Sequence, residues 1–278
     1  MSEIAELRPV IADIMKRRMA EIPIYQVDAF SSNVFSGNPA AICPLAEWLP
    51  DDQMQAIATE NNLSETAYFV RNGNGFRLRW FTPGCEVDLC GHATLASAYV
   101  LFHELGEPGE ALRFHTKSGE LQVRRDGDLL ALDFPSRPPE KVAENPALIA
   151  ALGVRPKEVL AARDYLVRYE TEQEVRALTP NMQALTEVDR FATIVTAPGS
   201  DCDFVSRFFA PAKGVPEDPV TGSAHCTLIP YWAEQLGKTT LHARQVGRRG
   251  GELFCKLKGD RVEIAGHAAL FLRGTIQL

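Results

Sequence analysis

An internal repeat at long range is the feature of this sequence that most constrains its fold. Three residues of one strand-like segment recur with the same spacing in a second segment: Arg79, Phe81 and Pro83 match Arg207, Phe209 and Pro211. After a short insertion in the second copy, further positions match: Glu86, Gly91, Ala93, Leu105 and Gly106 correspond to Glu217, Gly222, Ala224, Leu236 and Gly237. Both copies keep one order of strand, proline turn, acidic residue, glycine and helix. The sequence therefore predicts two similar halves.

Each half carries one strongly apolar helical segment. Ala93–Leu105 is apolar on nearly every face, and Ala224–Leu236 repeats this pattern. A helix that is apolar all round is buried, so both segments are expected to be core helices. Gly106 and Gly237 are suited to end them, because glycine tolerates the left-handed conformation that follows many helices. Pro230 falls inside the second segment and predicts a kink there.

Short strands joined by tight turns surround the two helices. The pattern predicts three hairpins, which pair 67–70 with 76–81, 121–125 with 129–134, and 253–257 with 261–265. The Asn-Gly and Asp-Gly sequences at two of these turns favour the positive φ angles of hairpin turns. We therefore predict an α+β fold with two pseudo-symmetric lobes, each a mostly antiparallel sheet rolled around a central buried helix.

The chain length of 278 residues suits one large or two medium-sized domains. The proline-rich stretch 135–139 breaks both helix and sheet, and predicts a boundary between an N-terminal lobe at 19–134 and a C-terminal lobe at 135–278. Residues 1–18 are polar and helical in character, and lack the apolar core of a secretory signal. We interpret them as a dispensable N-terminal extension.

Composition excludes several classes of protein. The chain is 45% hydrophobic and 23% charged, as expected for a globular protein and not for a disordered one. A net charge of −7 without a Lys/Arg tract argues against nucleic acid or a membrane surface as the main partner. The longest nearly apolar stretch, 93–102, is about half of the roughly 20 residues that a membrane span needs. Six cysteines without a Cys-x-x-Cys pair or a secretory signal predict reduced thiols and a cytoplasmic protein.

The starts of the two core helices form the first candidate site. One helix begins at Gly91, after Cys90, and the other at Gly222, after Thr221 and before Ser223. Free N–H groups at a helix N-terminus bind anions, and glycine lets a ligand approach the backbone closely. If the two halves pack face to face, both helix starts converge on one cleft that holds a small carboxylate. The alternative is that both glycines only permit tight entry into a helix.

Three ionisable residues lie near these helix starts. Glu65 lies in a polar turn before an apolar strand, His92 follows Gly91, and Pro219 favours an extended conformation for Asp218. A carboxyl or imidazole group at the edge of a buried cleft can transfer protons. Each residue also has a purely structural interpretation. Glu65 would be a solvated loop residue, His92 would bond to a backbone carbonyl, and Asp218 would be a turn residue.

Thiol chemistry and bound cofactors receive less support. Cys90 lies at a helix start, which lowers a thiol pKa, but its counterpart Thr221 is a poor base, so symmetric two-thiol chemistry is disfavoured. Cys90 is otherwise a small buried residue. The sequence has no phosphate loop, dinucleotide fingerprint or Gly-x-Ser-x-Gly elbow. The remaining histidines show no metal-ligand spacing, so no metal site is predicted: His103, His115, His225, His242 and His267. The Gly-rich segment 247–251 is interpreted as a turn.

Five segments together resemble the PhzF family of phenazine-biosynthesis isomerases. They are Gln26–Phe30 with Gly37–Pro39, Asn62–Thr66, Leu89–Thr94, Arg207–Pro211 and Glu217–His225. The resemblance covers nearly the whole chain from Ile22 onward. It implies a diaminopimelate-epimerase-like fold with the active site between two lobes.

The resemblance also implies roles for individual residues. Glu65 matches the family's proton shuttle, and His92 and Asp218 match its other catalytic residues. Further positions line the family's substrate pocket: Ser64, Gly91, Gly222 and Ser223. Cys90 and Thr221 occupy the positions of two thiols in the superfamily's cysteine-dependent racemases. Such proteins need no cofactor and are often homodimers. The best-understood member isomerises dihydro-3-hydroxyanthranilate by moving a proton between ring carbons.

Three hypotheses follow. The first is a cofactor-independent isomerase of a small carboxylated metabolite, in which Glu65 moves a proton with help from His92 and Asp218. The second is a racemase or epimerase that uses Cys90 with a different second base. The third is a non-catalytic metabolite-binding protein on an enzyme fold.

Overall fold

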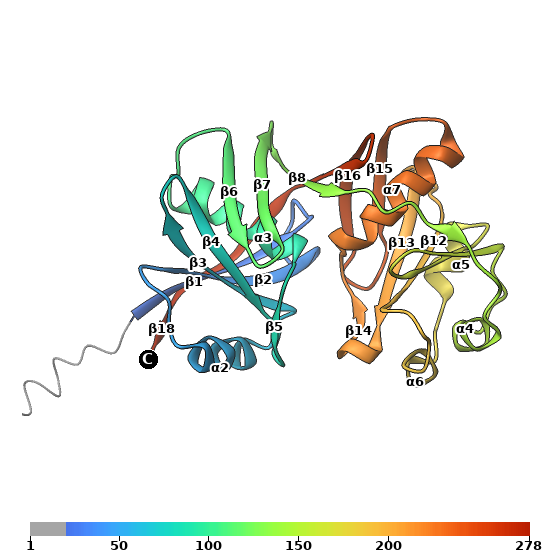
Figure 1. The fold of residues 1–278 in the computed structure, drawn as a ribbon, viewed down its shortest axis with the longest axis horizontal. Helices are drawn as coiled ribbons and strands as arrows, with labels where there is room; N and C mark the ends of the chain where they lie inside the picture. The colour runs from blue at the N-terminus through green and yellow to red at the C-terminus, as the bar shows by residue number, and fades with distance from the viewer. Residues whose placement is uncertain (1–20) are drawn as a thin grey trace, which may run out of the picture.

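Two lobes lie side by side, and strands of one continuous sheet run through both (Figure 1). The structure is a computed structural model that describes residues 21–278. The predicted extension 1–18 lies outside these residues. Within the described residues, no helix combines the length and apolar character needed to cross a membrane.

The first lobe contains the central helix of the first repeat. Its elements are β1 (Glu21–Ala29), β2 (Asn38–Leu45), α2 (Asp51–Asn61), β3 (Glu65–Asn72), β4 (Gly75–Phe81), β5 (Glu86–Val87), α3 (Gly91–Tyr99), η1 (Val100–Glu104), β6 (Ala111–Thr116), β7 (Gly119–Asp126) and β8 (Leu129–Pro135). The second lobe repeats the plan with additional short helices. It comprises β9 (Glu140–Lys141), α4 (Pro146–Leu152), β10 (Glu158–Ala161), β11 (Tyr165–Arg168), α5 (Glu172–Ala177), α6 (Met182–Leu185), β12 (Thr193–Pro198), β13 (Phe204–Ala210), η2 (Pro211–Lys213), β14 (Val215–Asp218), α7 (Gly222–Leu236), β15 (Thr240–Gln245), β16 (Gly251–Lys258) and β17 (Arg261–Gly266), followed by β18 (Ala268–Gln277).

The three predicted hairpins are confirmed. They are β3–β4, β7–β8 and β16–β17, all antiparallel. Gly73, Gly127 and Gly259 occupy their turns with φ of 59°, 63° and 65°, the left-handed region that glycine adopts without strain. The segment 247–251 is the turn between β15 and β16, as predicted.

Both core helices form, with one difference at the end of the first. Residues predicted as one helix divide into α3 and the wider π-helical turn η1, where the Leu105 N–H donates to the carbonyl of Val100. Gly106 follows with a positive φ of 66°. α7 continues through Pro230 to Leu236 without interruption.

Equivalent ion pairs confirm the internal repeat in three dimensions. Arg79 donates from Nε to Glu86 at 2.7 Å and from Nη2 at 3.0 Å. Arg207 donates to Glu217 in the same way, at 2.7 and 2.9 Å. A bidentate ion pair between arginine and a carboxylate requires a specific geometry. Because the same pair forms at equivalent positions, the two halves share a fold and not only a sequence pattern.

Two strand pairings tie the lobes together. β8 of the first lobe pairs with β17, from Pro135 opposite Arg261 to Leu130 opposite Gly266. β18 pairs with β1 along its whole length and crosses back to the first lobe (Figure 1). Residues 268–277 therefore belong to the sheet of the first lobe and not to the second, where the boundary at 135–139 placed them.

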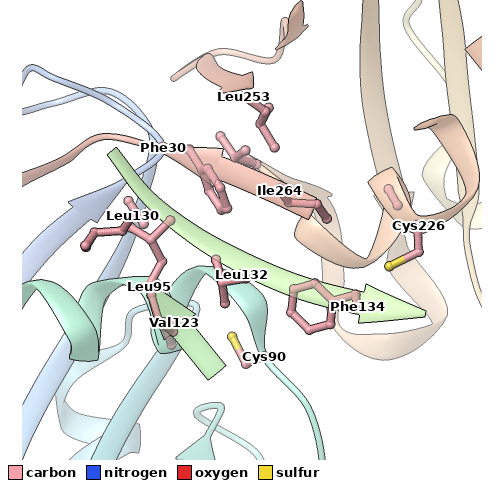
Figure 2. Close-up of a cluster of buried hydrophobic side chains, with 14 of the residues drawn as sticks. Phe30, Cys90, Leu95, Val123, Leu130, Leu132, Phe134, Cys226, Leu253 and Ile264 are labelled. Atoms are coloured by element: carbon pink, nitrogen blue, oxygen red, sulfur yellow. The ribbon is translucent and has the colours of Figure 1, made fainter. Parts of the chain in front are cut away.

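The main hydrophobic core extends across the junction between the lobes. It unites residues of α3 and β8 with residues of α7 and β17. Figure 2 shows Phe134 on β8 between Cys90 of the first lobe and Cys226 on α7. The relative position of the two lobes is thus fixed by packed apolar side chains as well as by shared strands.

Replacing Leu95 by alanine tests the role of the central helix. Leu95 on α3 is 0% exposed, and its truncation is expected to lower the free energy of unfolding by about 2–5 kcal/mol, measured by urea denaturation. The matched control is Leu105→Ala, because Leu105 is 46% exposed just beyond η1. Equal losses in the two variants would contradict a core role for α3.

Candidate functional site

A cavity of about 720 Å³ lies between the two lobes. All nine residues predicted for the site line it: Ser64, Glu65, Cys90, Gly91, His92, Asp218, Thr221, Gly222 and Ser223. They come from segments far apart in the sequence, so their convergence follows from the packing of one lobe against the other.

The N-termini of α3 and α7 meet in this cavity, as the repeat predicts. A Cβ atom added to Gly91 would lie 3.6 Å from the Cα of Gly222. Cys90 and Thr221 occupy equivalent N-cap positions, and neither side chain forms a capping hydrogen bond with its helix. Two helix N-termini with their partial positive charges therefore adjoin at one point, where an anion can bind.

Two polar side chains reach the site from the beginnings of two neighbouring strands. β2 and β3 run parallel, with Ala40 opposite Glu65, so the first residues of both strands lie at the same end of the strand pair. Asn38 begins β2 and Glu65 begins β3. This arrangement places an amide and a carboxylate beside the start of α3.

His92 lies between Glu65 and Cys90. Its Nε2 is 3.0 Å from Oε2 of Glu65, although the two atoms are not aligned as a hydrogen bond. Its Nδ1 is 3.5 Å from the Cys90 sulfur and 3.2 Å from Nδ2 of Asn38. Burial opposes a charge on the ring, but Cys90 and Glu65 outweigh this effect and raise the pKa of His92 well above its usual value.

The same three residues bring potential metal ligands together, but their contacts divide between the two ring nitrogens of His92. One ligand atom from each of Glu65, Cys90 and His92 lies within 4.8 Å of the others. However, Glu65 approaches Nε2 of the ring and Cys90 approaches Nδ1. Burial also raises the pKa of the Cys90 thiol to about 11, which disfavours the thiolate.

Asp218 reaches the cavity at the end of β14. It accepts hydrogen bonds from Nδ2 of Asn38 at 2.8 Å and from the hydroxyl of Thr221 at 2.5 Å. Burial raises its pKa to about 6, with the charge of Glu65 acting in the same direction, while His92 and the two hydrogen bonds oppose the rise. A carboxyl group with such a pKa can give or accept a proton near neutral pH.

Asn38 is a site residue that the residue-by-residue reasoning did not single out. Both hydrogens of its amide nitrogen are committed, to Asp218 and to the carbonyl of Val220, 2.9 Å away. Asn38 thereby joins β2 of the first lobe to the segment that precedes α7. Its only signal in the sequence was its place in the Gly37–Pro39 segment of the resemblance.

Gln245 is the second residue that sequence reasoning missed. It is buried on β15, where its amide nitrogen donates to the carbonyl of Asp218 at 2.6 Å. Its amide oxygen accepts from the N–H of Thr221 at 2.9 Å. Gln245 therefore fixes the backbone that carries Asp218 and Thr221. A single glutamine in a strand pattern gives no sign of such a role.

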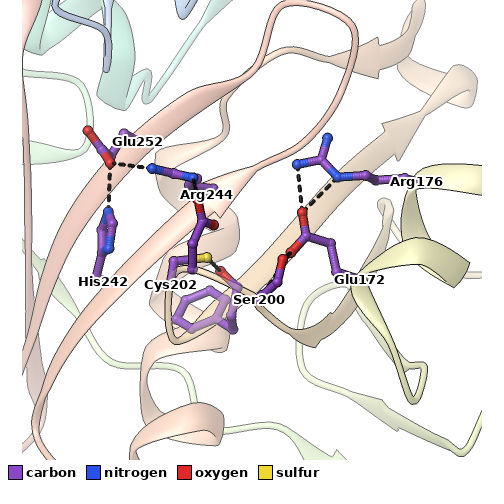
Figure 3. Close-up of polar contacts among 9 residues, drawn as sticks. Glu172, Arg176, Ser200, Cys202, His242, Arg244 and Glu252 are labelled. Atoms are coloured by element: carbon purple, nitrogen blue, oxygen red, sulfur yellow. Dashed lines mark hydrogen bonds and ion pairs between the residues drawn. The ribbon is translucent and has the colours of Figure 1, made fainter.

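A second polar cluster on the outer part of the second lobe does not line the cavity (Figure 3). In it His242 contacts Glu252 at 2.7 Å, and Glu252 also pairs with Arg244. Glu172 pairs with Arg176 on α5 and accepts hydrogen bonds from Ser200. These contacts join surface segments, and His242 has no part in the site.

Comparison with known proteins gives a consistent result. The phenazine biosynthesis-like protein family, PhzC-PhzF, matches residues 27–274. An uncharacterized isomerase of Pseudomonas aeruginosa is 55% identical over 258 residues, which cover 93% of this chain and all of the relative. A crystal structure of a PhzF-family phenazine biosynthesis protein from Enterococcus faecalis is 48% identical, with a TM-score of 0.92, and covers 93% of this chain and all of the other.

A more distant structure bears on the fold alone. A hydroxyproline epimerase from Agrobacterium vitis has a TM-score of 0.61 at 9% identity, with 93% of each chain covered. The predicted diaminopimelate-epimerase-like fold, with two pseudo-symmetric lobes, is thereby confirmed. The chain belongs to the PhzF family of phenazine biosynthesis-like proteins.

Proposed function

We propose that the protein is a cofactor-independent isomerase that moves a proton between carbon atoms of a small carboxylated metabolite. The observation that carries this proposal is the meeting of Glu65, His92 and Asp218 with two uncapped helix N-termini in one cavity. The isomerase name of the relative from Pseudomonas aeruginosa supports the same reaction class.

The helix starts supply the binding part of the reaction. The substrate carboxylate lies at Gly91 and Gly222, whose N–H groups and helix dipoles stabilise negative charge. When a proton leaves an adjacent carbon, the electron pair delocalises toward this carboxylate. The same groups then stabilise the additional charge of the carbanionic intermediate, which lowers the barrier.

The ionisable residues supply the proton transfer. Glu65 accepts the proton from the first carbon while His92, 3.0 Å from its carboxylate, orients it. Glu65 then returns the proton to a second carbon that shares the delocalised electron pair. One C–H bond has broken, another has formed, a double bond has shifted between them, and Glu65 is again a carboxylate. Asp218, with a pKa of about 6, is a second group that can take up or release a proton, and hydrogen bonds from Asn38 and Thr221 hold it in place.

The racemase hypothesis receives less support. Burial raises the pKa of Cys90 to about 11, and the hydroxyl of Thr221 is committed to Asp218. Neither position therefore offers a ready base. An active Cys90→Ala variant is the outcome that supports Glu65 over Cys90. The third hypothesis, a non-catalytic binding protein, requires that bound carboxylates exchange no carbon-bound proton.

Location and assembly are further parts of the proposal. All six cysteines are free, which suits a reducing compartment, and we propose that the protein is cytoplasmic. We also propose a homodimer, which light scattering coupled to size-exclusion chromatography would test; a monomer at all concentrations would contradict it.

Replacing Glu65 by glutamine tests the proton transfer directly. Wild-type protein in D₂O is expected to remove a carbon-bound proton signal from one member of a panel of cyclic and amino-acid carboxylates, followed by proton NMR. Glu65→Gln is expected to slow this exchange by about 10²–10⁴-fold, as for loss of a general base. The control is Glu60→Gln on the exposed face of α2. Full exchange by Glu65→Gln would refute the assignment.

Replacing Asp218 by asparagine tests the raised pKa. The folded-state pKa of about 6 exceeds the usual 3.8, so native protein binds the extra proton and loses relative stability as pH rises from about 4 to 6. At pH 7.5, Asp218→Asn is expected to be more stable than wild type by about 1–3 kcal/mol, and this gain shrinks at pH 4. Urea unfolding at both pH values measures it, with Asp128→Asn in the exposed β7–β8 turn as control. A pH-independent difference would contradict the prediction.

A further inference from the structure

We propose that the substrate carries a second anionic group, bound by Arg137 and Arg163 on the second-lobe wall of the cavity. This inference rests on the proposed function, because it concerns the substrate of the same site. It goes beyond the carboxylate at the helix starts, and it restricts the substrate class to small dianions.

Arg137 is a cation in the cavity wall without a counter-ion. Within residues 21–278 its guanidinium forms no hydrogen bond or ion pair, and its Nη1 is buried. Its backbone N–H donates to the carbonyl of Cys226 at 2.8 Å, which anchors this residue beside α7. A guanidinium cannot lose its charge in a protein, so a partly buried one with an unpaired, buried Nη1 has a cost that an anion bound there would relieve.

Arg163 lies close to Arg137 and is held in place. Its Nε and Nη2 donate to the buried carboxylate of Asp164 at 3.0–3.3 Å. Both arginines line the cavity, and both favour the ionised form of Asp164, which lowers the pKa of that carboxyl against the opposing effect of burial; the two guanidinium groups therefore share one region of the wall. Asp164 balances one of the two positive charges, and the other remains for a ligand.

An exposed aromatic ring completes this part of the wall. Phe191 is 42% exposed and lines the cavity. The guanidinium carbon of Arg163 is 4.4 Å from its ring centre, and the ammonium of Lys213 is 5.3 Å away. Cation–π contacts hold both cations at the cavity without neutralising them. The chain as a whole has a net charge of −7, so the positive charge gathered on this wall differs from the charge of the protein as a whole.

The second anion position adjoins the first. Nη2 of Arg163 lies 3.3 Å from the hydroxyl of Ser223, which follows Gly222 in the first turn of α7. A ligand whose first anionic group lies at the helix starts can therefore place a second anionic group near Arg163 and Arg137 if a short linker joins the two anionic groups. Arginine pairs well with both carboxylate and phosphate, so either group fulfils the requirement.

Matched pairs of ligands test the inference. Glutarate is compared with butyrate, and isophthalate with benzoate, by titration calorimetry on the Glu65→Gln variant, in which no turnover disturbs binding. At least one dianion is expected to bind about tenfold more tightly than its monoanionic partner, as for one added charge-assisted hydrogen bond. Arg137→Gln is expected to reduce that ratio to below threefold, while monoanion binding stays unchanged.

Two controls keep the result interpretable. Arg137 has no ion pair to lose, so Arg137→Gln is expected to fold, whereas Arg163→Gln would leave Asp164 buried and unpaired. The matched control is Arg155→Gln, on the same lobe but 76% exposed and outside the cavity. Equal affinity for dianion and monoanion in both pairs, or a ratio that survives Arg137→Gln, would overturn the inference. Failure of proton exchange by the wild type would instead count against the proposed function, since the binding ratio does not depend on turnover.

Discussion

The close approach of two helix N-termini is the constraint on which the rest of the site depends. Each terminus carries a partial charge of roughly +0.5, so α3 and α7 repel one another where Gly91 and Gly222 meet. Negative groups nearby relieve this repulsion, and Glu65 and Asp218 both lie in the same cavity. The local field thus explains why carboxyl groups gather there and why an anionic ligand suits the place between them.

Asn38 and Gln245 show how a duplicated fold becomes a single site. Asn38 belongs to the first lobe and holds Asp218 of the second, while Gln245 fixes the backbone from Asp218 to Thr221. Both side chains are buried. The hydrogen bonds of Asn38 cross the junction, whereas those of Gln245 stay within the second lobe and hold the segment to which Asn38 bonds. Misplacement of either lobe would leave buried polar groups unpaired, which gives the packing a strong preference for one arrangement.

The sequence predicted the parts of this site that have a local or repeated signal. Gly91 and Gly222 stand at equivalent places of a repeat, and Glu65, His92 and Asp218 lie in short recognisable segments. Asn38 was missed because its role comes from contacts 54 and 180 residues away in the chain. The return of β18 to β1 was missed for a similar reason, since pairing between distant strands leaves no mark on either strand alone. The π-helical turn η1 also had no signal in an evenly apolar segment.

The return of β18 to β1 has a consequence for how the chain folds during synthesis. β1 leaves the ribosome before the other described elements, but its partner β18 follows the entire second lobe in sequence. Until that strand arrives, one edge of the first sheet is open and able to pair with other chains. The first lobe therefore closes last, and the cavity between the lobes forms only after the second lobe and β18 have been synthesised.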